Sequence, residues 1–204
     1  MSTHTMSVFF ALLALACWCA VAAIAILAAA HRARPDSGPA LLFEDLSRVA
    51  LWLAFVVALV TTLGSLYYSE VAHFVPCKLC WYQRIAMYPL SVILLVGALR
   101  RDRRVWWYVV PQAVVGAGFA LYHTQLQAYP GQGSSFCTIS EPCTVRYVWE
   151  FGFVSLPFMA LSAFVAVVAL VLVARSAPDA DVTARRFDAR PAPVERPHSV
   201  VEIP

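Results

Sequence analysis

Long apolar runs alternate with short polar segments along the 204-residue chain. Each of the five runs has 18–25 residues, and together they contain one charged residue, Arg84. A helix of about 20 residues crosses a hydrocarbon core of about 30 Å. Backbone groups in lipid must hydrogen-bond internally, and the alternating pattern of a membrane barrel is absent, so we expect an all-α polytopic membrane protein. The five predicted spanning helices cover residues 6–30, 49–68, 81–99, 105–122 and 152–174.

The composition excludes a soluble domain. Apolar residues make up 61% of the chain and charged residues 13%, whereas a soluble domain is about a quarter charged. A disordered or collagen-like chain is excluded by the same apolar content. The net charge is only +3, which does not indicate a basic surface for binding nucleic acid. The expected surroundings are membrane lipids, with no nucleic-acid partner.

The basic residues predict the orientation of the helices. Of the 15 Lys and Arg residues, 12 lie in segments 31–48, 100–104 and 175–204. Basic residues in short loops concentrate on the cytoplasmic side. We therefore expect a multi-pass protein of the bacterial cell membrane, with segments 69–80 and 123–151 extracytoplasmic and the C-terminus cytoplasmic.

The two ends of the chain differ from the middle. Residues 1–30 are expected to form an extra N-terminal transmembrane helix. A cleaved signal peptide is disfavoured, because no basic residue precedes the run and 25 apolar residues exceed a signal core. Residues 176–204 are rich in Pro, Asp and Arg, which predicts a disordered cytoplasmic tail.

Four of the six cysteines are predicted to face the outer compartment, where disulfides persist. Cys77 and Cys80 form a CxxC motif at the start of the third helix, and Cys137 and Cys143 lie in the long outer loop. Two pairs in different loops on one face suit disulfide exchange. The alternatives are structural disulfides or a zinc site. Zinc is disfavoured because no His follows at ligand spacing, and a staple across residues 137–143 contributes only about 2.4 kcal/mol.

The position of the CxxC motif favours thiolate chemistry. Pro76 suits the first position of a helix, which would place Cys77 and Cys80 near the positive end of the helix dipole. Lys78 and Arg84 add positive charge, and each effect lowers a thiol pKa from about 8.5. Arg84 shares a helical face with Cys80. It either extends to the headgroups or polarises a carbonyl oxygen of a bound acceptor.

The other two cysteines, Cys17 and Cys19, lie inside the first helix. Residues two apart on a helix point about 200° away from each other, so these thiols cannot pair with one another. We interpret both as small apolar packing residues.

Three sequence strings resemble the DsbB family of membrane thiol:quinone oxidoreductases, particularly its BdbC-like branch in Gram-positive bacteria. The most specific string is CKLCWYQR at residues 77–84, followed by MYP at 87–89. The others are HTQLQAYP at 123–130 and WEFGF at 149–153, which leads to Pro157. The order of the two cysteine pairs also matches. The resemblance covers about residues 45–175, and the first helix is additional to the four of the family.

The resemblance implies a four-helix transmembrane bundle and a soluble thioredoxin-fold partner of the DsbA or BdbD type. The protein would reoxidise this partner and form disulfides. Carried over by position, Cys137 is the site attacked by the reduced partner, and Cys143 is its mate in the loop. Electrons would then pass to Cys77 and Cys80 by thiol exchange, through a transient bond between Cys77 and Cys143.

The resemblance also implies a quinone cofactor, ubiquinone or menaquinone, bound near the outer membrane surface. Cys77 and Cys80 would lie beside the quinone, with Cys80 facing its ring. Arg84 and His123 occupy the positions of the cofactor-binding residues of the family. From the residues alone, His123 is equally well explained as a helix-capping or headgroup contact.

Two other functions compete with this interpretation. In a vitamin-K-epoxide-reductase-like protein the loop cysteines precede the membrane CxxC, whereas here the CxxC comes first. A membrane conduit that carries electrons outward would keep its working cysteines within the bilayer, where only Cys17 and Cys19 lie. The non-enzymatic alternative is a membrane scaffold with structural disulfides in its outer loops.

Overall fold

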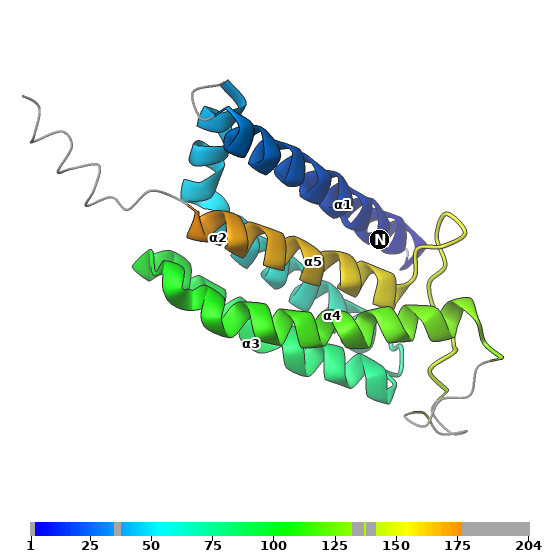
Figure 1. The fold of residues 1–204 in the computed structure, drawn as a ribbon. Coiled ribbons are helices and arrows are strands. Elements are labelled where there is room, and N and C mark those ends of the chain that lie inside the picture. Colours follow the sequence, from blue (N-terminus) through cyan, green and yellow to red (C-terminus); the bar gives the residue numbers. More distant parts are fainter. Residues whose placement is uncertain (1–2, 35–37, 132–136, 138–141, 177–204) are drawn as a thin grey trace, which may run out of the picture.

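A computed structural model describes residues 3–34, 38–131, 137 and 142–176, and these are almost entirely helical (Figure 1). The long helices are α1 (Thr3–Ala33), α2 (Gly38–Leu66), α3 (Lys78–Arg100), α4 (Trp106–Ala128) and α5 (Leu156–Arg175). A π-helical turn, η1 (Tyr67–Val71), follows α2, and a 3-10 turn, η2 (Arg103–Val105), precedes α4. Among the described residues there is no strand, only an isolated bridge between Glu150 and Val154. The predicted all-α fold is confirmed, since five helices are long and apolar enough to cross a membrane.

The helices form a four-helix bundle with one helix added outside it. α2, α3, α4 and α5 pack around a shared core. α1 packs against α2 and α5, on the side of the bundle opposite α3 and α4 (Figure 1). The prediction of four bundle helices plus an extra N-terminal helix is therefore confirmed. The predicted tail beyond residue 176 lies outside the described residues.

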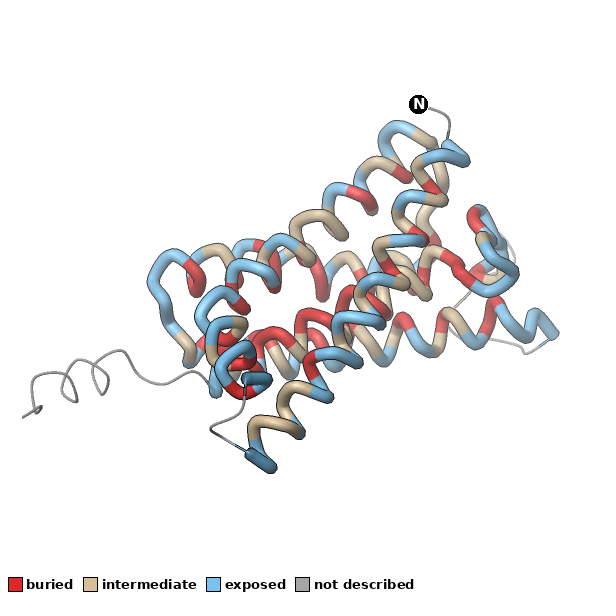
Figure 2. Tube along the Cα trace, turned by 90° about the horizontal axis from the view of Figure 1, so that it is seen from above, coloured by how far each residue is buried: buried red, intermediate tan, exposed pale blue. Residues whose placement is uncertain are grey.

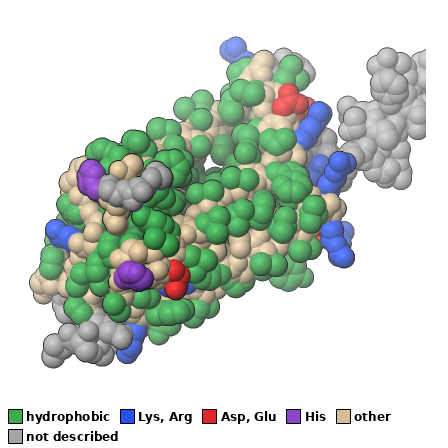
Figure 3. Space-filling view, turned by 180° about the vertical axis from the view of Figure 1, so that it is seen from behind, with side chains coloured by type: hydrophobic (Ala, Val, Ile, Leu, Met, Phe, Trp, Pro, Cys, Tyr) green, Lys and Arg blue, Asp and Glu red, His purple; other side chains and the backbone are tan. Residues whose placement is uncertain are grey.

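Large apolar side chains and small residues alternate in the core of the bundle. Phe164 of α5 is fully buried and rests on Gly116 of α4, where an added Cβ would lie 2.3 Å from the Phe164 ring. Buried positions follow the inward sides of the helices, and exposed positions lie outside (Figure 2). Hydrophobic side chains cover most of the visible outer face, with charged ones gathered toward its ends (Figure 3). An apolar band between charged ends is what a bilayer requires.

Two helix boundaries differ from the prediction. α2 begins at Gly38, eleven residues before the apolar run at 49–68. The helix continues into a polar segment where Asp45 and Arg48, both exposed, pair at 3.5 Å. The last helix begins at Leu156 instead of residue 152, because Phe151 and Gly152 have positive φ angles of 53° and 80° and form a turn. Apolar runs therefore locate spans better than they locate helix ends.

Candidate functional site

Cys77 is the N-cap residue of α3. Its Sγ accepts a hydrogen bond from the backbone N–H of Cys80 at 3.4 Å. The helix begins at Lys78, two residues later than expected from Pro76 as the first helical residue. This correction places the Cys77 sulfur directly on the unpaired N–H groups of the first turn, where a negative charge is most favoured.

The two CxxC sulfurs lie close to each other. Both cysteines are free thiols, and their Sγ atoms lie 3.1 Å apart. Hydrogen bonding from Cys80, assisted by His123 and opposed by burial, lowers the pKa of Cys77 to about 4. The lowered pKa favours the thiolate form of Cys77, and a low-pKa thiolate is a good leaving group in thiol exchange.

His123 of α4 lies between the two cysteine pairs, with 2% of its surface exposed. Its Nε2 lies 3.1 Å from the carbonyl oxygen of Cys143, which can only accept, so Nε2 carries a proton. The side-chain nitrogen of Gln83, which can only donate, lies 3.0 Å from Nδ1, so Nδ1 is the acceptor of this pair. The same Nε2 lies 3.8 Å from the Cys77 sulfur. Gln83 thus orients His123 as a donor toward both Cys77 and the loop.

All four outer cysteines belong to one apolar cluster. Cys137 and Cys143 form a disulfide with a Cα–Cα distance of 5.8 Å. Cys143, at 3% exposure, packs with Cys77, Leu79 and Leu126, and the other two cysteines contact this group. The structure therefore brings together two sulfur pairs separated by more than fifty residues of sequence.

The segment after Cys143 is fixed to the end of α4. The side-chain nitrogen of Gln127 donates to the carbonyl oxygen of Val145 at 2.8 Å. The Arg146 guanidinium donates back to the carbonyl oxygen of Gln127 and stacks over Trp149. These reciprocal bonds hold the Cys143 end of the loop against the bundle.

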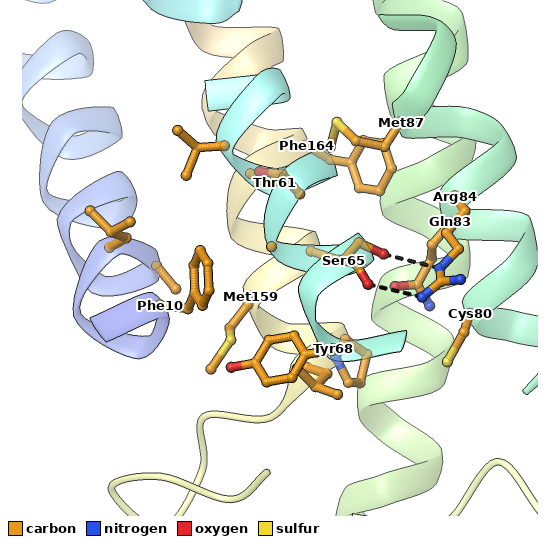
Figure 4. A pocket seen from close by; sticks show the side chains of 18 of the residues that line it. Phe10, Thr61, Ser65, Tyr68, Cys80, Gln83, Arg84, Met87, Met159 and Phe164 are labelled. Atoms are coloured by element: carbon orange, nitrogen blue, oxygen red, sulfur yellow. Dashed lines mark hydrogen bonds between the residues drawn. The ribbon is translucent and has the colours of Figure 1, made fainter. Parts of the chain in front are cut away.

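A cavity of about 410 Å³ opens beside Cys80, between α1, α2, α3 and α5 (Figure 4). Its size falls within the range of about 300–1,000 Å³ typical of small-molecule sites. Cys80, Gln83, Arg84 and His123 line it, whereas Cys77 does not. The two CxxC sulfurs therefore differ in their surroundings, since Cys80 borders the cavity and Cys77 packs toward the loop disulfide.

Arg84 lines the cavity and is bonded to α2. Its Nε and Nη2 groups donate to the hydroxyl and carbonyl oxygens of Ser65, each at 3.0 Å (Figure 4). Ser65 lies near the end of α2, just before the helix continues into the π-helical turn η1. Tyr88 donates to the same hydroxyl at 3.2 Å. The guanidinium is thereby held in the cavity wall, and Nη1 takes no part in the bonds to Ser65.

The predicted site residues thus lie in one cluster of cysteines and around one cavity. The structure adds residues that the sequence does not single out for the site. The sequence patterns indicate no role for Gln83 or Ser65, although both are polar residues within apolar runs. Cys17 borders the cavity, whereas Cys19 is exposed on the outer face of α1. The ligand atoms of Cys77, Cys80 and His123 lie within 4.8 Å of one another. Three such ligands can hold a metal, although a structural zinc site needs four.

Comparisons with known proteins identify close relatives. The family model described as disulfide bond formation protein DsbB matches residues 47–174. Disulfide bond formation protein C of Bacillus subtilis (strain 168) is 46% identical over 121 residues, or 59% of this chain and 88% of that protein. The probable disulfide formation protein of Coxiella burnetii (strain CbuK_Q154) is 41% identical over 125 residues, or 60% and 85% of the two chains. No solved structure matches. The family match begins within α2, so α1 lies outside it.

Proposed function

Because this chain belongs to the DsbB family of disulfide bond formation proteins, we propose that it is a membrane thiol:quinone oxidoreductase that reoxidises a thioredoxin-fold partner. The observation that supports this most strongly is the continuous path from the loop disulfide to the cavity. Cys143 and Cys77 belong to one apolar cluster, and His123 Nε2 lies within hydrogen-bond distance of both residues. The Cys77 and Cys80 sulfurs lie 3.1 Å apart, and Cys80 borders the cavity. The distribution of the basic residues supports an extracytoplasmic position for the four cysteines, in a bacterial cell membrane.

The first exchange takes place at the loop disulfide. A thiolate of the reduced partner attacks Cys137, which breaks the Cys137–Cys143 bond and forms a mixed disulfide. The second thiol of the partner then displaces Cys137. The partner leaves as a disulfide, and Cys137 and Cys143 remain as thiols. The position of Cys143 against the bundle keeps it close to Cys77 throughout.

The second exchange passes the electron pair to the CxxC motif. The Cys143 thiolate attacks the Cys77 sulfur, so the Cys77–Cys80 bond breaks and Cys80 becomes the free sulfur of the pair. Cys137 then attacks Cys143, which restores the loop disulfide and releases Cys77. The lowered pKa of Cys77 makes it a good leaving group in this step, and the proton on His123 Nε2 stabilises its charge.

The third step returns the CxxC pair to the disulfide. Two thiols that form a disulfide release two electrons and two protons. A quinone bound in the cavity would supply the oxidising power, because it accepts the two electrons and two protons when it is converted to a quinol. The cavity fits such a molecule, because its walls are largely apolar and its polar groups gather beside Cys80. Arg84 would hold a carbonyl oxygen there and stabilise negative charge developing on it.

The experiment uses the purified full-length protein in lipid nanodiscs with decylubiquinone and a reduced DsbA-type protein. Quinone absorbance should fall as the partner becomes oxidised. Cys80→Ser should abolish turnover, because the sulfur that borders the cavity is removed. Cys19→Ser, a change at an exposed cysteine, is the matched control and should retain it. Turnover by Cys80→Ser, or none by the unmodified protein, would refute the proposed function.

A further inference from the structure

The extra helix α1 forms one wall of the cavity, although it lies outside the family match. Its contribution comes from one helical face, since the residues recur at helical spacing. The lining residues of α1 are Phe10, Leu13, Ala14, Ala16, Cys17 and Ala20. We infer that α1 is a binding element for the isoprenoid tail of the quinone, an inference that rests on the proposed function.

Two hydrogen bonds connect α1 to the rest of the protein and fix this wall in place. Toward its N-terminus, Ser7 accepts a buried hydrogen bond from the hydroxyl of Tyr68 at 3.2 Å. Between the lining residues Cys17 and Ala20, the indole of Trp18 donates to the hydroxyl of Ser162 at 2.9 Å. Polar partners of this kind bind helices together in lipid, where packing alone has no hydrophobic driving force.

The glycine at position 64 of α2 lets α1 approach closely. A Cβ on Gly64 would lie 2.9 Å from the ring of Phe10. That ring reaches across into the cavity and lies 5.8 Å from the ring of Tyr68. Phe10 is on the opposite side of the cavity from Cys80 and Arg84 (Figure 4). The cavity therefore extends across the bundle, from the redox end to α1.

The chemistry of the lining changes along this direction. The redox end carries the thiol of Cys80, the guanidinium of Arg84 and the amide of Gln83, whereas α1 presents aliphatic and aromatic groups and one thiol. A molecule with a polar ring and an apolar tail matches this gradient. An acyl chain of a lipid would use the apolar end alone and leave the redox end without a role. We therefore assign the α1 end to the tail of the quinone whose ring lies at Cys80.

The test measures equilibrium binding by quenching of tryptophan fluorescence in the full-length protein. The probes are decylubiquinone and the same ring without its tail. Cys17→Phe fills the cavity at α1, and Cys19→Phe places the same side chain on the exposed face of the same helix. Displacing about two methylene groups of the tail weakens binding about tenfold. The ratio of the two dissociation constants should therefore change about tenfold in Cys17→Phe and stay constant in Cys19→Phe.

The outcomes separate this inference from the proposed function. Cys17→Leu, a smaller change, is measured beside Cys17→Phe so that a packing defect in one variant does not decide the result. An unchanged ratio in both variants would show that α1 does not bind the tail, whether both affinities stay intact or both fall equally. A protein that binds both probes but shows no turnover would refute the proposed function and leave the tail site standing.

Discussion

Two sides of the site meet at the CxxC cysteines, and they are built from different contacts. On the loop side, Cys143 is held by hydrogen bonds from side chains to backbone carbonyls, through His123, Gln127 and Arg146. On the cavity side, Cys80 and Arg84 face a space with largely apolar walls. The loop side therefore consists of a peptide segment fixed to the bundle, whereas the cavity side has space for a small molecule.

This difference explains why the two sulfurs of the CxxC motif can have different roles. The N-cap residue lies just outside the first turn of a helix, so the first cysteine of a CxxC motif in that position can contact other neighbours than the second. Cys77 caps the helix and contacts the loop side, while Cys80 lies one turn further into the bundle. Substitutions on one side should therefore affect thiol exchange, and substitutions on the other should affect the quinone.

The largest effect on activity is expected from Arg84→Met, which removes the positive charge on the cavity side of the site. Loss of one preorganised donor to a developing oxyanion lowers the rate by about 100-fold or more, and we expect a loss of about 100-fold in kcat/KM for decylubiquinone. The rate at which a reduced partner reduces the loop disulfide should stay unchanged. Arg84→Lys, which keeps the charge but not the paired bonds to Ser65, should be intermediate. An equal loss in the thiol step would show that the two sides are not separate.

The sequence predicts the membrane spans and the candidate cysteines, because long apolar runs and cysteine motifs can be recognised from local sequence alone. Apolar runs locate five spans because a bilayer imposes one length and one chemistry. The CxxC string and the loop cysteines mark the candidate sulfurs, whose roles stay predictions. What the sequence does not predict depends on packing between distant segments. Neither the position of His123 between the pairs nor the approach of Phe10 to Gly64 follows from any local pattern.

The second largest effect is expected on the pKa of Cys77, from a substitution of Gln83. The Gln83 amide donates to His123 Nδ1, which leaves the proton of the ring on Nε2. In the unmodified reduced protein, alkylation of Cys77 by iodoacetamide should be half-maximal near pH 4 and slow further as the pH falls, because protonation removes the thiolate. In Gln83→Leu, His123 is no longer held with its proton on Nε2, so the thiolate loses a donor. The midpoint should rise by about one pH unit, a change of about tenfold in acidity.

Mass spectrometry of the labelled peptide distinguishes Cys77 from the other thiols. Phe119→Leu, a substitution of a partly buried side chain beside the same cluster that makes no hydrogen bond to His123, serves as the control. An unchanged midpoint in Gln83→Leu would show that helix capping and Cys80 alone set the acidity of Cys77. The link between the two sides would then not pass through His123.

The smallest effect is expected on the loop side, from Gln127→Leu. This change removes the bond to the Val145 carbonyl, and a neutral hydrogen bond contributes only about 0.5–1.5 kcal/mol. With the Cys143 end of the loop less firmly held, stopped-flow measurements with a reduced DsbA-type protein should show transfer from the loop pair to the CxxC pair slowed about threefold. The dissociation constant for decylubiquinone should not change, because Gln127 does not line the cavity. If Gln127→Leu weakened quinone binding as strongly as it slowed transfer, the loop and the cavity would form one cooperative unit, and the division at the CxxC motif would be wrong.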